Sequence, residues 1–544
     1  MTPPLDLALV NGRVRTMDPG RDGGAQAPAT AIGVRGDQVV VLGDDAAVRA
    51  EADGSTEVVD LKGAVVLPGI VDSHVHPFHG ALDARGADLM DARTLDDVRR
   101  LVAAERATCA PDQWVLGFGL DYNAFAESGI SGELIAEAAG GGPALLTFID
   151  FHTALATPRA LELAGVDGPR TFPEHAEIVV GADGRPTGEL RERGAMDLVS
   201  AAQPALSDAE RYRILADQLG RFAATGITCL HGMDGTLETL DTLRELEGNG
   251  DLITRMVMPF WSQPDTPEET WEAYARHRQE HGERWRMGVA KLFIDGVIDT
   301  GTGWLFEADS EGDGLAPFWP DIDKYFRAVA FFAAEGFQVV THATGDRGVH
   351  EALNAYKKAG AAPGVHHRIE HIETLQAEDL PRFAAEGVIA SMQAQHMMWI
   401  EPDRSDNWSR RLGAERTAPG RAFPTRSLWE SGALVTLGSD WPVARYDWRE
   451  GLAAAQLRRP PGHPEREAYD DQGLTALQAL EGYTTRPART VGDDRLGALR
   501  PGRLADLTVV GEDPVEIPAD DLPSNPVALT VVGGEVVFRG AGVG

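Results

Sequence analysis

Cysteine is scarce in this sequence. Cys109 and Cys229 are the two cysteines in 544 residues, and they do not form a CxxC pair. Two thiols cannot build a disulfide framework, so we expect both to be reduced and buried. Long apolar runs are also missing, because no uncharged stretch approaches the roughly 18 residues of a membrane helix. The N-terminus lacks the basic and apolar regions of a signal peptide, which favours a cytoplasmic protein.

Basic side chains are few relative to acidic ones. The chain has 50 Lys and Arg against 84 Asp and Glu, a formal net charge of −34. Nucleic-acid binding draws much of its affinity from clustered basic residues, and no such cluster occurs. The same negative charge would repel anionic membranes. With 43% hydrophobic and 25% charged residues the chain is typical of a globular protein. We therefore expect a small-molecule partner and no nucleic-acid or membrane partner.

The hydrophobic pattern divides the chain into three parts. Residues 1–68 and 496–544 contain short strand-like runs separated by turns such as Asn11-Gly12 and Gly533-Gly534. Neither part buries enough alone, so we expect both chain ends to form one small β-sandwich domain. Residues 69–495 alternate apolar runs with amphipathic stretches, which predicts a distorted (β/α)₈ barrel of the α/β class. The expected buried strands are 70–73, 114–118, 144–149, 227–231, 253–258, 288–294, 338–342, 367–371, 388–392 and 434–437.

Histidine and aspartate residues stand at the ends of several predicted barrel strands. His74 and His76, in VDSHVHP, lie two residues apart and therefore face the same side of a strand. His342, His371 and Asp440 end three later strand-like runs. Barrel active sites lie at the carboxyl ends of the strands, and imidazole with carboxylate suits a metal such as zinc. The pattern predicts a metal centre.

Several longer motifs resemble the amidohydrolase superfamily, in particular its amidohydrolase 3 branch, which includes enzymes similar to N-substituted formamide deformylase. The resemblance extends over essentially the whole chain and implies a barrel with a β-sandwich built from both termini. The matching stretches are LPGIVDSHVHP, GRPTGELRERGAM, KLFIDGVID, THATGDRGV, HRIEHIE, SMQAQH, LGSDWPV and GALRPGRLADLTVV.

The resemblance implies one or two divalent ions per chain, with zinc the expected metal. His74, His76 and Asp440 would hold one ion, and His342 and His371 a second. The family pattern selects His371 over His366 and His367. Lys291, carboxylated by carbon dioxide to N6-carboxylysine, would bridge two ions, because a free ammonium has no lone pair for ligation. Glu192 is the alternative bridging ligand.

The expected chemistry follows from these ligands. Divalent ions lower the pKa of bound water toward about 7, so that hydroxide can attack a polarised carbonyl. Asp440 would accept the proton and return it to the leaving nitrogen. The sequence therefore predicts a hydrolase acting on an amide-type carbon–nitrogen bond, and the resemblance implies N-formyl or N-acyl compounds as substrates. Esterase, lactonase or carbamate hydrolysis on the same centre, and metal-dependent isomerisation, stay open as alternatives.

Further polar and aromatic residues near the strand ends are expected to contact substrate. Asp346 and Arg347, which follow His342, are expected to form an ion pair that orients the histidine loop. Family members are often dimers, so a homodimer is expected, and no motif for an organic cofactor appears. The expected substrate-binding residues are His152, Trp304, Arg347, His396 and Trp441.

Overall fold

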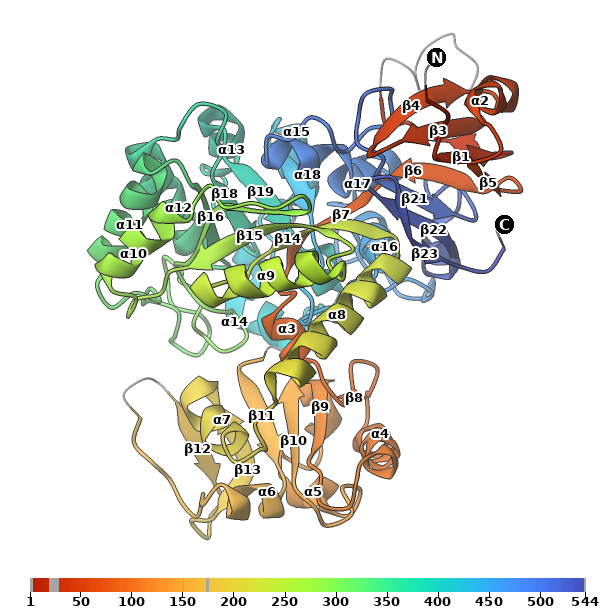
Figure 1. Cartoon of the computed structure of the whole chain (residues 1–544). Helices are drawn as coiled ribbons and strands as arrows, with labels where there is room; N and C mark the ends of the chain where they lie inside the picture. Colours follow the sequence, from red (N-terminus) through yellow and green to blue (C-terminus); the bar gives the residue numbers. More distant parts are fainter. Residues whose placement is uncertain (1–2, 19–28, 150, 173–175, 543–544) are drawn as a thin grey trace. The chain divides into compact units, whose positions relative to one another are not determined.

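The computed structural model describes residues 3–18, 29–149, 151–172 and 176–542 (Figure 1). It divides into two compact units. The first contains residues 1–77, 216–441 and 445–544, and the second contains residues 78–215 and 442–444.

The core of the first unit is an eight-stranded parallel sheet that nearly closes into a barrel. All seven strand pairs are parallel, and Val75 and Trp441 form a further parallel bridge between the two end strands. This confirms the predicted barrel. In order, the strands are β7 (Ile70–Val75), β14 (Ile227–Gly232), β15 (Arg255–Trp261), β16 (Trp285–Phe293), β17 (Gln338–Ala343), β18 (Arg368–His371), β19 (Ile389–Met392) and β20 (Val435–Leu437).

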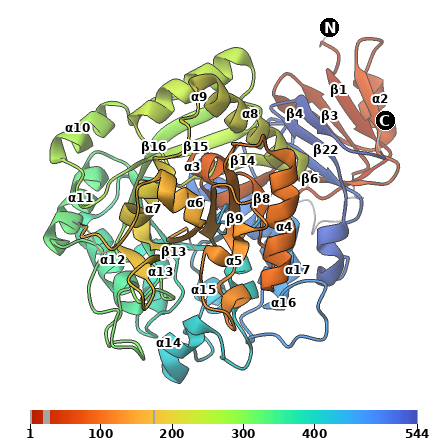
Figure 2. The ribbon, with the colours of Figure 1, turned by 90° about the horizontal axis from the view of Figure 1, so that it is seen from below.

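Helices follow most barrel strands, and α9 to α13 succeed one another around the outside of the strands (Figure 2). Their buried faces carry apolar side chains at helical spacing, such as Leu240, Leu243 and Leu246 in α9. The helices are α9 (Leu237–Asn249), α10 (Glu268–Arg276), α11 (Ile322–Ala334), α12 (Asp346–Ala359), α13 (Leu380–Glu386), α14 (Asn407–Arg416), α15 (Thr425–Glu430), α16 (Trp448–Leu457), α17 (Ala476–Gly482) and α18 (Thr485–Thr490). Helix α8 (Asp208–Ala224) precedes β14.

The first unit also has two small sheets, one formed by N-terminal strands alone and one by strands from both chain ends. Strand β6 from the N-terminal segment pairs antiparallel with β21 from the C-terminal segment. Residues of the two segments, including Leu9, Val66 and Val531, bury their side chains in one apolar cluster. The sheets are β4-β3-β1-β5 (Gln38–Gly43, Ala31–Arg35, Leu7–Val10, Glu57–Asp60) and β2-β6-β21-β22-β23 (Arg13–Val14, Val65–Pro68, Leu507–Val510, Val527–Val532, Glu535–Arg539). Helix α2 (Asp45–Glu51) lies between β4 and β5 in the chain. The domain boundaries at residues 68 and 495 stay predictions.

The second unit contains the two candidate strands that the barrel does not use. Residues 114–118 and 144–149 were among ten candidates for a barrel that needs eight strands, and β9 and β10 lie in a separate mixed sheet. They are apolar and parallel to each other, so their local pattern is that of barrel strands. The sheet order is β12-β13-β11-β10-β9-β8 (Glu177–Val180, Pro186–Arg191, Thr153–Ala156, Ala144–Phe148, Val115–Leu120, Ala87–Asp88), with α3 (His79–Asp83), α4 (Leu95–Thr108), α5 (Glu133–Ala136), α6 (Pro158–Leu163) and α7 (Glu192–Ser200).

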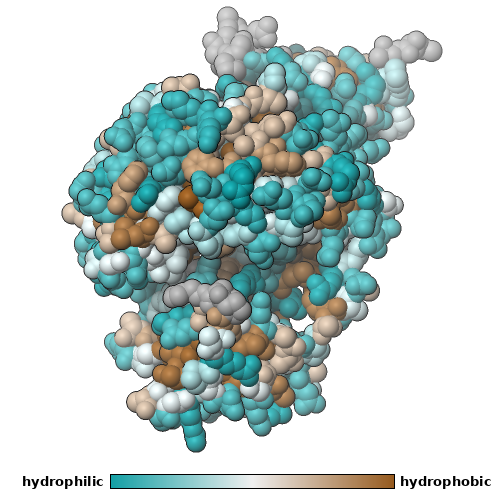
Figure 3. Space-filling view, turned by 90° about the vertical axis from the view of Figure 1, so that its left-hand side faces the viewer, coloured by the Kyte–Doolittle hydropathy of each residue, from teal (hydrophilic) through white to brown (hydrophobic). Residues whose placement is uncertain are grey.

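The surface agrees with the acidic composition. On the face seen in Figure 3, hydrophilic side chains predominate and apolar ones form separate patches. Within the described residues, no helix combines the length and apolarity needed to span a membrane. Cys229 is buried as expected, whereas Cys109 is partly exposed, and neither forms a disulfide.

Candidate metal centre

The predicted ligands come from the carboxyl ends of barrel strands. His74 lies near the end of β7 and His76 just beyond it, while His371 ends β18 and Asp440 follows β20. The backbone N–H of Asp440 donates to the carbonyl of His74 at 2.7 Å, and that of His76 donates to Trp441 at 2.9 Å. These bonds join the first and last strands, so closure of the barrel itself brings the ligands together.

Four imidazole rings surround the Asp440 carboxylate. Its Oδ1 lies 3.1 Å from His74 Nε2 and 3.2 Å from His76 Nε2. Its Oδ2 lies 3.5 Å from His396 Nε2 and 3.9 Å from His371 Nδ1. Sequence reasoning placed His396 among the substrate contacts, whereas the structure places it beside the predicted ligands.

The residues fit a metal ion. Ligand atoms of His74, His371 and Asp440 lie within 4.8 Å of one another, and all three side chains are buried. The Nε2 atoms of His74 and His396 are buried and face Asp440, and within the described residues neither makes a hydrogen bond of good geometry. Burying such a group unpaired costs about 1–3 kcal/mol, a cost that an ion at this position would remove. Two imidazoles and one carboxylate form a donor set typical of zinc.

The backbone is strained at two of these residues. His371 has φ 72° and Asp440 has φ 59°, in the left-handed region that residues other than glycine seldom adopt. Each such conformation costs on the order of 1–3 kcal/mol and is found mainly at functional sites. In this protein the strain turns the side chain that ends a strand toward the centre of the barrel rim.

A buried ion pair that sequence reasoning missed supports His74. Glu370 Oε2 lies 2.5 Å from His74 Nδ1, and Arg368 Nη2 donates to the same oxygen at 2.9 Å. Burial raises the pKa of Glu370, but the charge of Arg368 and the hydrogen bond from His74 outweigh it and hold the pKa well below its usual range. An ionised Glu370 requires a proton on Nδ1 and leaves the lone pair on Nε2, the atom that faces Asp440. The sequence did contain a signal for this pair, because Arg368 and Glu370 are charged residues at alternate positions of an otherwise apolar strand.

Lys291 and His342, the other predicted ligands, contact different partners from the residues around Asp440. Lys291 is buried, its Nζ lies 5.0 Å from the centre of the Phe293 ring, and burial lowers its pKa to about 8. The His342 ring lies 4.4 Å from that of His371, while its Nε2 contacts the carbonyl of Gly296 at 3.0 Å. The proposed second ligand set therefore stays a prediction.

Asp295, also missed, organises the loop beside His342. Its carboxylate accepts backbone N–H groups from Trp304 at 2.8 Å, Thr344 at 3.0 Å and Gly345 at 2.8 Å. Burial raises the pKa of Asp295 to about 7. The loop that carries Trp304 is thereby fixed to the end of β17.

The expected Asp346–Arg347 ion pair is wrong. Asp346 Oδ2 instead accepts from Gln376 Nε2 at 2.6 Å and from Arg421 Nη2 at 3.2 Å. Asp346 begins helix α12 and is fully buried, so its carboxylate points into the protein toward partners that are distant in sequence. Such partners leave no local pattern in the sequence.

The remaining predicted residues fall in two places. His152 Nδ1 lies 2.9 Å from Glu192 Oε2, and both belong to the second unit. Glu192 has φ 63°, so it shares the backbone strain of the two ligands. Trp441 is buried, and its ring packs 5.3 Å from that of Phe222. The roles of Glu192 and His152 stay predictions.

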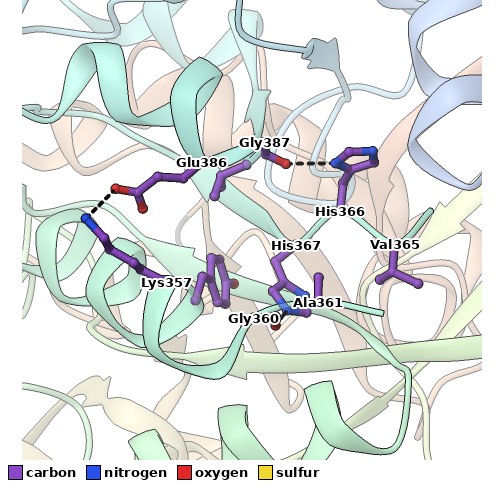
Figure 4. Close-up of a pocket in the computed structure, with 10 residues that line it drawn as sticks. Lys357, Gly360, Ala361, Val365, His366, His367, Glu386 and Gly387 are labelled. Atoms are coloured by element: carbon purple, nitrogen blue, oxygen red, sulfur yellow. Dashed lines mark hydrogen bonds and ion pairs between the residues drawn. The ribbon is translucent and has the colours of Figure 1, made fainter. Parts of the chain in front are cut away.

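His366 and His367 lie at the opposite ends of the strands, around the pocket in Figure 4. His366 Nδ1 contacts the carbonyl of Gly387 at 3.0 Å, and His367 Nε2 contacts that of Gly360 at 2.8 Å. Both rings therefore pair with the backbone, far along β18 from His371.

Comparison with known proteins agrees with this architecture. Protein LONG AFTER FAR-RED 3 of Arabidopsis thaliana is 28% identical over 564 aligned positions, covering 99% of this chain and 93% of the relative. N-substituted formamide deformylase of Arthrobacter pascens is 25% identical, with 100% of both chains covered. The solved structure of an uncharacterized metal-dependent hydrolase from Pyrococcus horikoshii has a TM-score of 0.72 at 21% identity and covers 94% of this chain and 99% of that chain.

The family assignment rests on most of the chain. The sequence pattern of the amidohydrolase family matches residues 57–538, a range that includes every barrel strand and all the residues around Asp440. This protein therefore belongs to the amidohydrolase family.

Proposed function

We propose that this protein is a metal-dependent amidohydrolase that hydrolyses the carbon–nitrogen bond of an N-formyl or N-acyl compound. The observation that carries the proposal is the buried convergence of His74, His371 and Asp440, in which His74 Nε2 faces the Asp440 carboxylate. Family membership supports the hydrolase class, and a relative that covers the whole chain is a formamide deformylase. An N-formyl group is accordingly the first acyl group to test.

In this proposal the side chains hold the reacting groups and move one proton. A divalent ion, zinc by the chemistry of its ligands, would supply a Lewis acid that activates water and polarises the carbonyl. Burial opposes ionisation of Asp440, but the surrounding imidazoles outweigh it and hold its pKa well below the usual value. An ionised Asp440 can accept the proton of the attacking water and deliver it to the leaving nitrogen.

Metal content and product formation test the proposal together. We expect protein purified without chelator to contain at least about one divalent ion per chain by mass spectrometry of the elements. It should release formate or another carboxylate from a panel of N-formyl and N-acyl amines. Chelator should abolish this activity and added zinc should restore it. Absence of activity on every amide after zinc or manganese is added would contradict the proposal, and turnover of esters alone would change the bond class.

We further propose that Lys291 becomes N6-carboxylysine. Its pKa near 8 raises the fraction of neutral amine at neutral pH, and the neutral amine is the form that attacks carbon dioxide with loss of a proton. We expect Lys291→Ala to lower the metal content, and added formate or acetate to restore part of it. Lys324→Ala is the matched control, because Lys324 Nζ donates to the carbonyls of Pro264 and Thr266.

The outcome also distinguishes the two bridging residues. Full metal content in Lys291→Ala without added acid would exclude the lysine and favour Glu192. Native mass spectrometry of the wild-type protein tests the modification directly. A mass that lacks the addition of one carbon dioxide would contradict it.

A further inference from the structure

An arginine that follows the predicted ligand His342 in sequence has no carboxylate partner among the described residues. Arg347 lies in the first turn of α12, five residues after His342. Its guanidinium carbon lies 4.7 Å from the centre of the Trp304 ring and 5.9 Å from that of Phe306. Its Nε is buried without an acceptor, and among the described residues its guanidinium makes neither a hydrogen bond nor an ion pair.

Three other arginines of the same region, unlike Arg347, have carboxylate partners. Arg421 lies 3.2 Å from Asp346, Arg416 lies 3.8 Å from the same carboxylate, and Arg411 pairs with Asp309. The chain has 84 acidic residues, so carboxylates are abundant. Arg347 nevertheless contacts two aromatic faces, which fix the position of a guanidinium and leave its N–H groups available.

A second unpaired donor belongs to the ring on which Arg347 stacks. Trp304 is 4% exposed, and its buried indole Nε1 has no hydrogen-bond partner in the part of the chain that the structure describes. Buried N–H groups are normally satisfied, and each exception calls for an explanation such as an absent ligand or water. Two unpaired donors on stacked neighbours are most simply explained by one acceptor group that the protein does not itself supply.

The backbone fixes both donors to the rim of the barrel. The N–H of Arg347 donates to the carbonyl of Trp304 at 3.0 Å, and a Cβ at Gly345 would lie 2.2 Å from that carbonyl oxygen. Only glycine allows this close approach of the loop to α12. The same loop supplies the Gly296 carbonyl that contacts His342 Nε2. Trp304 therefore lies on the loop that also contacts the His342 ring, and Arg347 is held to that loop through its backbone N–H.

We propose that Arg347, assisted by the Trp304 indole N–H, binds a carboxylate of the substrate. The substrate is then an N-formyl or N-acyl compound that carries a carboxylate outside the bond to be cleaved. A planar guanidinium matches a carboxylate with parallel hydrogen bonds, and the N-terminus of α12 adds positive potential. A net charge of −34 repels anions, so an anionic substrate needs a local cation of this kind. The inference rests on the proposed amidohydrolase function.

A matched pair of compounds separates charge recognition from hydrolysis. N-formylphenylalanine and N-formylphenethylamine differ only in the carboxylate, and both enantiomers of the former are included. Isothermal titration calorimetry gives each dissociation constant, and formate release gives kcat and KM on the same zinc-loaded protein. We expect an enantiomer of N-formylphenylalanine to bind more tightly than the neutral compound and to compete with it.

The variants test the two donors separately. Arg347→Met should weaken binding of the carboxylate compound about ten- to a hundredfold, because a charge-assisted hydrogen bond is lost, and should affect the neutral compound much less. Arg347→Lys should retain part of the preference, since it keeps the charge and loses the planar fork. Trp304→Phe keeps the ring and removes the N–H, so a smaller loss is expected. Arg244→Met is the control, because Arg244 pairs with Asp241 and Glu280.

The failure of each hypothesis is distinct. Equal affinity for the two compounds, no binding of either, or an equal effect of Arg347→Met on both would overturn the carboxylate site even if formate is released. Simultaneous binding of both compounds would show an anion site apart from the substrate site and also overturn it. Selective, Arg347-dependent binding without formate release would support the carboxylate site and count against deformylation.

Discussion

Asp440→Asn is expected to lower turnover at least about a thousandfold while the barrel stays folded, because a metal ligand and a proton acceptor are lost together. The carboxylate lies within 4 Å of nitrogen atoms from four imidazole rings, and those rings keep it ionised. The neutral amide has no charge with which to hold an ion and cannot accept a proton from water.

Asparagine is the informative replacement at this position. Asp440 has φ 59°, and asparagine tolerates the left-handed region better than alanine does. A loss of activity in Asp440→Asn can then be attributed to the lost carboxylate and not to a change in backbone conformation. Asp520→Asn serves as the control, because Asp520 pairs with Arg459 and accepts from Gly462. Steady-state rates and thermal unfolding check the prediction, and an Asp440→Asn enzyme with normal turnover would remove this residue from the site.

Glu370→Gln is expected to weaken metal binding about ten- to a hundredfold, as the loss of a carboxylate behind a ligating histidine generally does. Glu370 and Arg368 are at most 1% exposed, and the carboxylate fixes the protonated nitrogen of His74. Glutamine can present an N–H to Nδ1, which favours the tautomer whose lone pair lies on the wrong nitrogen. Competition with a chelating dye measures the affinity, and nitrogen NMR of His74 in metal-free protein reports the tautomer.

A second buried glutamate provides the control. Burial, reinforced by the charge of Asp299, raises the pKa of Glu373 to about 8, so this residue is mostly protonated at pH 7. Glu373→Gln therefore replaces one neutral group with another. In the wild-type protein Trp408 Nε1 donates to Glu373 Oε2 at 2.6 Å, and the amide oxygen of glutamine can accept the same hydrogen bond. We expect little change in metal affinity.

The folding of Glu370→Gln needs its own check, because an unpaired buried Arg368 is costly. The double variant Arg368→Met/Glu370→Gln removes that charge. Wild-type affinity and an unchanged His74 tautomer in either folded variant would contradict the positioning role.

Much of the fold was predictable because strand and helix periodicities are local properties of the chain. Eight expected strands occur in the barrel, including those that end at His342 and His371. The expected strands 114–118 and 144–149 lie elsewhere, since an apolar parallel strand has the same local pattern in any sheet. The expected partner of Asp346 was wrong for a similar reason, because Gln376 and Arg421 lie 30 and 75 residues away.

The sequence alone determined the barrel, the family resemblance and the residues that end the strands, because these follow from periodicity and from short motifs. Only the tertiary structure decided that Asp440 lies among four imidazoles, that Glu370 fixes the His74 ring and that Arg347 stacks on aromatic rings. Each of these is a relation between side chains on different strands or loops. Strand closure and backbone conformation set such distances, and neither is encoded in the local spacing of residues.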